Sequence, residues 1–291
     1  MKIVISIPAF NEEKTLGKVI NEIKGVMKLY DYQVLVLDDG SDDKTVEVAK
    51  KNGAVVVSNK RNLGLAETFK REMTECLKLK ADIIVHTDAD GQYPSSYIPL
   101  MIKKVQTGND LVLGSRFKKG SYSGSLMKRL GNIAFAKVFS KLLKTRIYDT
   151  TTGFRAFNSE VAKLPLINDF TYTQEQIIRA GKANMKIGEV FIQTNKTRPS
   201  RLFKNSFDYA AKAWINILRI YRDFAPLKFF GRIGFLFIGS GFILGLFIMY
   251  HISAFGTAGG IPRVILSMLL ILVGVQIWLF GFLADMNKKY D

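Results

Sequence analysis

The amino-acid sequence of this 291-residue chain predicts an α/β fold with a doubly wound, mostly parallel sheet, followed by a hairpin of two membrane-crossing helices. In residues 1–117, runs rich in Val, Ile and Leu alternate with amphipathic helical segments, which is typical of parallel strands covered by helices on both faces. Residues 233–250 and 264–284 contain no charged side chain, and each segment is close to the ~20 residues that span a hydrocarbon core. The alternative for these two segments is a buried helical hairpin in a soluble protein.

The alternation in the first part of the chain defines strands and helices in order. Each strand is a short apolar run, and each helix repeats its apolar residues at helical spacing. In a sheet of this kind, ligands bind beyond the carboxyl ends of the strands. The predicted strands are residues 2–10, 33–40, 54–59, 81–90 and 109–117, and the predicted helices are residues 12–30, 42–53, 65–80 and a segment that begins at residue 95.

The charge of the chain predicts an acidic partner. The formal net charge is +17 and the isoelectric point is 9.8, which suits nucleic acid, anionic lipid or a phosphate-rich substrate. Residues 116–146 contain many Lys and Arg but no acid, and a second basic stretch, residues 206–224, repeats Phe207, Trp214 and Tyr221 every seven residues. Basic amphipathic helices of this kind suit a membrane surface, although an ordinary surface helix is the alternative. The single cysteine excludes an internal disulfide and a cysteine-based zinc site.

The basic residues around the apolar segments predict their orientation. Lys228 and Arg232 precede the first segment and two lysines follow the second, whereas Arg263 is the only Lys or Arg in the connecting loop. The positive-inside rule then places both termini in the cytoplasm and makes the chain a multi-pass protein of the cell membrane. Gly241 and Gly245 form a pattern that favours helix association, so a homo-oligomer through these helices is a further expectation.

The sequence His86-Thr-Asp88-Ala-Asp90-Gly-Gln92 follows the apolar run of the fourth strand. Asp88 and Asp90 are two residues apart on extended chain, so their carboxylates point the same way. Two carboxylates at a strand end form a hard-oxygen site suited to Mg²⁺ or Mn²⁺, to which Gln92 adds a neutral oxygen. The alternative is a pair of capping aspartates.

The carboxyl end of the second strand carries Asp38-Asp39-Gly-Ser41. An acid at this place in a doubly wound fold can bind the ribose or base of a nucleoside, while Ser41 also suits a helix N-cap. The turn after the first strand, Pro8-Ala-Phe-Asn-Glu12, has neither the glycine pattern of a dinucleotide site nor that of a phosphate loop.

These motifs together resemble those of the inverting family-2 glycosyltransferases with the GT-A fold. PAFNE, DDGS, RNLG, DADGQ, GSR and TTGFR occur in the order and spacing of that family, and the pattern is most similar to dolichyl-phosphate mannose synthases and polyprenyl-phosphate glucosyltransferases. The resemblance covers residues 1–205, which are expected to form a cytosolic catalytic domain. Residues 206–228 would then be an interfacial helix and linker, and residues 229–291 the transmembrane hairpin.

The resemblance also implies roles for individual residues. The nucleotide sugar would be bound by Pro8, Ala9, Asn11, Glu12, Asp39 and Asp88. The metal, Mg²⁺ or Mn²⁺, would be held by Asp88, Asp90 and Gln92. Catalysis would depend on Asp90, Gln92 and Arg116. The acceptor and the phosphates would be contacted by Arg129, Thr152, Arg155, Arg198, Ser200 and Arg201. Pro199 departs from the spacing of the family, so the choice between Arg198 and Arg201 stays open.

The expected reaction transfers a hexose, with inversion, from GDP-mannose or UDP-glucose to dolichyl or another polyprenyl phosphate. A phosphate monoester has its second pKa near ~6 and is largely dianionic at neutral pH, so it needs no strong general base. Glu175, where many family members place a base, is therefore expected only to help position groups. The alternatives are a family-2 transferase with another lipid or polysaccharide acceptor, and a nucleic-acid-binding membrane protein. The paired aspartates and the absence of a basic-aromatic RNA motif argue against nucleic acid.

Overall fold

The computed structural model describes residues 1–117, 126–167, 172–195, 215, 218–219, 221–258 and 260–287. Within the first helix after residue 125, the side chains of residues 126–132, 134 and 135 lie outside this description. The chain divides into two compact units, Met1–Ala211 and Lys212–Asp291.

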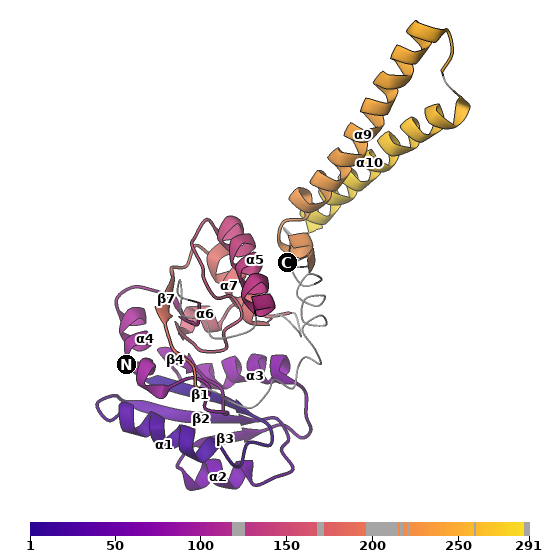
Figure 1. Cartoon of the computed structure of the whole chain (residues 1–291). Coiled ribbons are helices and arrows are strands. Elements are labelled where there is room, and N and C mark those ends of the chain that lie inside the picture. The colour runs from indigo at the N-terminus through magenta and orange to yellow at the C-terminus, as the bar shows by residue number, and fades with distance from the viewer. Residues whose placement is uncertain are drawn as a thin grey trace. The chain divides into compact units, whose positions relative to one another are not determined.

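The first unit is a seven-stranded sheet with helices on both faces (Figure 1). The order of the strands across the sheet is β3-β2-β1-β4-β6-β5-β7. Every neighbouring pair is parallel except the two pairs that include β6. The strands are β1 (Ile3–Ala9), β2 (Tyr32–Asp38), β3 (Val55–Ser58), β4 (Ile83–His86), β5 (Leu111–Ser115), β6 (Arg155–Asn158) and β7 (Ile187–Phe191). The helices are α1 (Leu16–Val26), α2 (Thr45–Lys51), α3 (Leu65–Lys78), η1 (Ser95–Tyr97), α4 (Ile98–Gln106), α5 (Leu126–Leu143), α6 (Ser159–Ala162) and α7 (Tyr172–Lys182).

The doubly wound, mostly parallel sheet confirms the predicted fold class. The five predicted strands are β1 to β5, each somewhat shorter than the apolar run that predicted it. The strand β6 was not assigned from the sequence, and it runs antiparallel between β4 and β5, with Ile84 opposite Phe157 and Val112 opposite Ala156. Because β6 runs in the opposite direction, its first residue lies at the edge of the sheet where β4 and β5 end.

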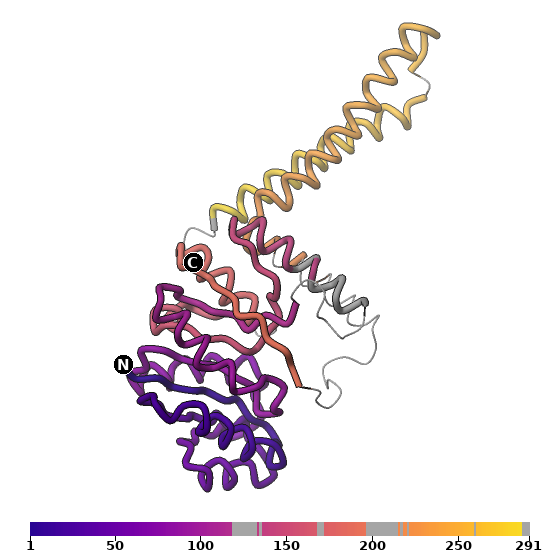
Figure 2. Tube along the Cα trace, turned by 60° about the vertical axis from the view of Figure 1, so that its left-hand side comes forward, coloured from indigo at the N-terminus to yellow at the C-terminus, as the bar shows by residue number. Residues whose placement is uncertain are grey.

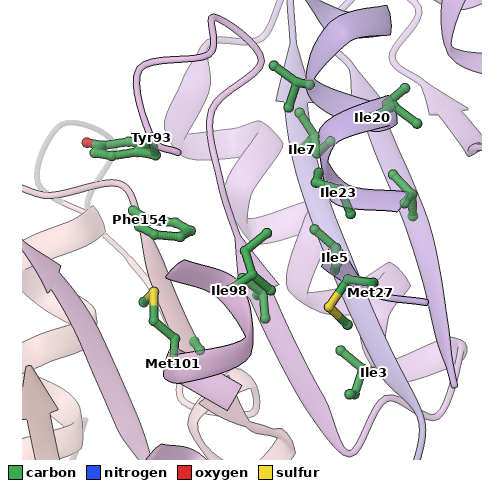
Figure 3. Close-up of a cluster of buried hydrophobic side chains, with 14 of the residues drawn as sticks. Ile3, Ile5, Ile7, Ile20, Ile23, Met27, Tyr93, Ile98, Met101 and Phe154 are labelled. Carbon is green, nitrogen blue, oxygen red and sulfur yellow. The ribbon is translucent and has the colours of Figure 1, made fainter. Parts of the chain in front are cut away.

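The main core lies between the sheet and the helices α1 and α4. The side chains of Ile3, Ile5 and Ile7 alternate along β1 toward this face and are 0–1% exposed (Figure 3). Ile20 of α1 and Ile98 of α4 pack against them from outside the sheet. The other face of β1 and β2 is covered by α3 (Figure 1). Because the sheet is packed on both faces, the end of each strand has a fixed position, and so does the start of the loop that follows it.

The second unit contains two long helices, α9 (Pro226–Phe255) and α10 (Ile261–Asn287), which run side by side (Figures 1 and 2). Both are long and apolar enough to cross a membrane. A methyl group built on Gly234 would stand 2.6 Å from the carbonyl oxygen of Gly274, and one on Gly241 would stand 2.8 Å from that of Ser267. Ser267 Oγ also donates a hydrogen bond of 2.8 Å to the carbonyl oxygen of Gly241. Gly241 therefore packs within one chain, and self-association of the chain stays a prediction without support from this residue.

Candidate active site

The predicted motifs meet at one edge of the sheet. Pro8 and Ala9 end β1, Asp38 ends β2, and Arg116 follows β5 directly. The aspartate motif follows β4, whose carboxyl end points the same way because β1, β4 and β5 are mutually parallel. The carboxyl edge of the sheet therefore gathers side chains that are far apart in the sequence.

A tight turn after β4 presents Asp88 and Asp90. The backbone N–H of Gln92 donates a hydrogen bond of 2.9 Å to Asp90 Oδ1, which closes the turn. The side-chain amide of Asn195 donates to the carbonyl oxygen of Gly91 at 3.0 Å, and its backbone N–H donates to that of Gln92 at 2.9 Å. The segment after β7 thus holds this turn in place.

The Thr-Gly-Phe-Arg segment lies directly against the aspartate turn. A methyl group built on Gly153 would stand 3.1 Å from Asp88 Oδ1. The backbone N–H of Gly153 donates to the hydroxyl of Tyr93 at 3.2 Å, and the Tyr93 ring stacks on that of Phe154 with centroids 5.2 Å apart (Figure 3). The motif predicted for the acceptor and the motif predicted for the metal therefore pack against each other at Gly153 and Asp88.

The surroundings of Asp88 make its carboxylate harder to ionise than an exposed one. Burial raises the pKa of Asp88, the neighbouring Asp90 acts in the same direction, and His86 and Arg116 oppose it. A divalent cation facing both carboxylates would favour their ionised forms. In the part of the chain that is described, Asp88 and Asp90 are neighbours, but no set of three His, Cys, Asp or Glu side chains converges on one point. Mg²⁺ is commonly held in this way, by one or two carboxylates together with substrate phosphates.

The turn after β1 is tied to the turn after β2. The backbone N–H of Asn11 donates to Ser41 Oγ at 3.0 Å, and Asn11 Oδ1 accepts from the N–H of Asp42 at 3.0 Å. The backbone N–H of Glu12 donates to Thr45 Oγ1 at 2.8 Å. These contacts bring the two halves of the predicted nucleotide pocket together and fix Asn11 at a positive φ of 54°.

Asp39 holds the Arg-Asn-Leu-Gly loop. Its Oδ1 accepts hydrogen bonds from Asn59 Nδ2 at 2.7 Å and from the N–H of Leu63 at 2.9 Å, and its Oδ2 accepts from the N–H of Gly64 at 2.9 Å. Asp39 is 5% exposed. The sequence placed Asp39 in the nucleotide pocket but did not show that it also shapes the neighbouring loop.

Arg116 is held by a partner that the sequence analysis missed. Asp149, which is fully buried, receives Arg116 Nε at 2.7 Å on Oδ2 and Arg116 Nη2 at 3.1 Å on Oδ1. Arg116 Nη2 also donates to Thr151 Oγ1 at 2.7 Å. Although burial alone would raise the pKa of Asp149, the guanidinium and the hydrogen bonds hold it below its usual range. This two-point pairing fixes the direction of the guanidinium.

Arg155 and Thr152 lie inside the domain. The Arg155 side chain is 0% exposed and donates to the carbonyl oxygens of Thr152 and Thr173 and to Gln176 Oε1, the last at 2.8 Å. Thr152 is also fully buried, and its Oγ1 accepts from the N–H of Phe154 at 3.2 Å. These contacts hold both side chains within the domain around Gly153, and their predicted contact with the acceptor stays a prediction.

Glu175 is also enclosed. Its carboxylate accepts hydrogen bonds from the N–H of Ile167 at 3.1 and 3.2 Å and forms an ion pair of 2.8 Å with Arg179. The Glu175 side chain is 0% exposed. A carboxylate in this position ties the chain before α7 to the helix and is not turned toward an open surface.

Comparisons with known proteins identify the family of the chain. Residues 4–164 match the sequence profile described as Glycosyl transferase family 2. The chain belongs to this family. It is 35% identical over 190 residues to the dolichyl-phosphate hexose transferase of Haloferax volcanii, covering 62% of this chain and 77% of that protein. It is 27% identical over 296 residues to the prophage bactoprenol glucosyl transferase homolog of Escherichia coli, covering 98% of this chain and 93% of that protein.

Solved structures of other transferases share the fold of this family-2 chain. Glucosyl-3-phosphoglycerate synthase of Mycobacterium tuberculosis, crystallised with Mn²⁺, uridine diphosphate and phosphoglyceric acid, superimposes with a TM-score of 0.60 at 24% identity, over 76% of this chain and 77% of that one. Together, the family and its relatives indicate that the chain is a hexosyltransferase.

Several residues that the family resemblance singled out lie outside the described residues. They are Arg198, Ser200 and Arg201, together with the side chain of Arg129. The same holds for Phe207 and Trp214 of the second basic stretch. Their predicted roles stay predictions.

Proposed function

We propose that this family-2 transferase moves a hexose from a nucleotide sugar, GDP-mannose or UDP-glucose, to a polyprenyl phosphate, with inversion at the anomeric carbon. The observation that carries the choice of acceptor is the enclosure of Glu175. This carboxylate, at the position where many family members place a base, is ion-paired with Arg179 and bonded to the Ile167 backbone. An acceptor that arrives as a phosphate anion needs no such base.

The apolar helices support a lipid acceptor. The E. coli relative named a bactoprenol glucosyl transferase homolog aligns with 98% of this chain, so the similarity extends through α9 and α10. The H. volcanii relative is named a dolichyl-phosphate hexose transferase. In our proposal the helices anchor the enzyme in the cell membrane with both termini in the cytoplasm, so that its sheet edge works on headgroups of the cytoplasmic leaflet.

The reaction is a single displacement. An oxygen of the acceptor phosphate attacks the anomeric carbon while the bond from that carbon to the nucleoside diphosphate breaks, and the diphosphate leaves with the electron pair. Asp88, Asp90 and Gln92 would hold Mg²⁺ or Mn²⁺, which when bound neutralises charge on the leaving diphosphate. Arg116, fixed in direction by Asp149, supports the same charge from the protein side. The loops that carry Pro8, Asn11 and Asp39 hold the nucleoside.

A comparison of acceptors tests the proposal. Membranes containing the chain are incubated with a panel of nucleotide sugars and with polyprenyl phosphate, the unphosphorylated polyprenol, or phosphoglycerate, and products are identified by mass. We expect a hexosyl product only with polyprenyl phosphate. Equal use of polyprenol would contradict the phosphate acceptor and favour a family-2 transferase with a different lipid acceptor.

A further inference from the structure

The edge strand β7 contacts the active-site edge through one acidic side chain. Glu189 lies in the middle of β7, opposite Leu113 of β5. Its Oε1 accepts two backbone hydrogen bonds from consecutive residues, from the N–H of Tyr148 at 3.0 Å and from that of Asp149 at 3.1 Å. A carboxylate that receives two adjacent main-chain donors fixes the backbone of that segment.

The segment held by Glu189 contacts two predicted site residues, Arg116 and Asp88. The carboxylate of Asp149 accepts hydrogen bonds of 2.7 and 3.1 Å from the guanidinium of Arg116. At Gly153, four residues further on, the backbone lies against Asp88 Oδ1. Any displacement of residues 148–149 therefore moves the anchor of Arg116, and it loosens the start of the segment that packs on Asp88.

We propose that Glu189 is a positioning residue of the transfer reaction, which holds residues 148–153 so that Arg116 faces the leaving diphosphate. This inference rests on the proposed function, because it takes Arg116 to act on the donor. Glu189 itself touches neither the donor nor the acceptor in this account.

Glu189 titrates in the range where the enzyme is expected to work. Burial raises the pKa of Glu189 to about 7, and the negative charge of Asp149 acts in the same direction against the two backbone donors. Lys104 of α4 donates to the backbone carbonyl of Glu189 at 2.6 Å, and Arg146 lies 4.8 Å over the Tyr148 ring. The remaining charged groups on the described elements packed against β7 are Lys103 of α4 and three residues of α7. Those of α7 are Glu175, paired with Arg179, and Lys182.

The direction of the effect follows from hydrogen-bond strength. Above pH 7 the ionised carboxylate holds the two N–H groups more strongly than the neutral acid does below it. As the pH rises, residues 148–149 should therefore be held more firmly, and with them the Asp149 carboxylate that orients Arg116. We expect kcat to rise over the same pH range. The folding stability contributed by Glu189 changes with pH in the opposite direction to kcat. Because folding raises the pKa of this carboxyl from its ordinary value of 4.5 to about 7, the contribution is fully present below pH 4.5 and is lost as the pH rises through about 7.

The variant Glu189→Gln separates these two effects. Glutamine keeps an acceptor oxygen for both N–H groups but cannot ionise. The acceptor phosphate has its own pKa near ~6, so the informative quantity is the ratio of wild-type kcat to variant kcat at saturating acceptor across pH 5.5–8.5. The phosphate ionises alike in both reactions and cancels from this ratio.

We expect the ratio to stay near unity below pH 6 and to rise roughly threefold to tenfold with an inflection close to pH 7, with the KM for the nucleotide sugar unchanged. The variant Glu189→Leu, which removes the acceptor, should lower kcat roughly tenfold at every pH and speed amide hydrogen exchange at residues 148–149. Glu160→Gln, an exposed acid of α6 paired with Lys163, is the matched control and should give a flat ratio of one.

Two outcomes would separate the hypotheses. If the wild-type chain transfers sugar to polyprenyl phosphate but the ratio for Glu189→Gln is flat, the role of Glu189 is wrong while the proposed function stands. If the wild-type chain forms no such product, the proposed function fails, and unchanged hydrogen exchange at residues 148–149 in Glu189→Leu would independently overturn the hold of Glu189 on this segment.

Discussion

Substituting Gly153 by alanine tests whether the contact between the two central motifs matters. The added methyl group would stand 3.1 Å from Asp88 Oδ1, closer than ordinary van der Waals contact, so the carboxylate must move by a few tenths of an ångström. Metal–ligand distances tolerate changes of only about 0.2 Å. Because Gly153 does not have a positive φ, alanine adds no backbone strain. We therefore expect the concentration of Mn²⁺ or Mg²⁺ that gives half-maximal transfer to rise roughly tenfold to a hundredfold.

The assay is a metal titration of the initial rate at saturating donor and acceptor, with thermal unfolding followed on the same samples. Gly25→Ala is the matched control, because Gly25 is exposed on α1 and a methyl group built there meets nothing within 4 Å. That variant should leave the metal requirement unchanged and stabilise the helix by about 0.5–1 kcal/mol. A Gly153→Ala enzyme with the wild-type metal requirement would refute the placement of the metal beside Asp88.

Three further predictions concern topology, stability and the acceptor. A cysteine introduced at Thr257, in the loop between α9 and α10, should react with a membrane-impermeant reagent added from outside, and labelling from the cytoplasmic side only would reverse the orientation. Glu72→Ala removes the buried partner of His86, 2.7 Å away, and should lower the free energy of unfolding by about 1–3 kcal/mol in denaturant titrations. The control Glu22→Ala, at an exposed residue, should change the free energy of unfolding by less than about 0.5 kcal/mol. Equal effects of the two variants would show that the buried pair does not stabilise the fold. Arg129→Ala should weaken the dependence of turnover on polyprenyl phosphate more than the calorimetric affinity for the nucleotide sugar, and an unchanged acceptor dependence would remove Arg129 from the acceptor site.

The sequence predicted the parts of the fold that repeat a simple pattern. The strands β1 to β5 are continuous apolar runs, and their carboxyl ends carry the polar motifs, so both the sheet and its functional edge could be predicted. The strand β6 could not, because four residues that begin with Arg155 show no periodicity. Its antiparallel direction depends on pairing with β4 and β5, which only the folded chain reveals.

The roles of buried charges were the least predictable part of the site. Arg155 belongs to a motif associated with the acceptor, yet its partners Thr173 and Gln176 follow about twenty residues later and draw it into the interior. Asp149 precedes that motif without any pattern of its own, although it decides where Arg116 points. A sequence shows which residues can carry charge, but burial and pairing decide whether that charge faces a ligand or supports the residue that does.

The most direct test of the proposed function is product analysis with the purified 291-residue chain and its Asp90→Asn variant. Each protein is incubated with the preferred nucleotide sugar, polyprenyl phosphate and Mg²⁺ or Mn²⁺, and the lipid fraction is analysed by mass spectrometry. The proposed function predicts a polyprenyl-phosphate hexose from the wild-type chain that disappears with EDTA, returns when the metal is restored, and is absent for the folded Asp90→Asn variant. Undiminished product in the presence of chelator, or from Asp90→Asn, would contradict it.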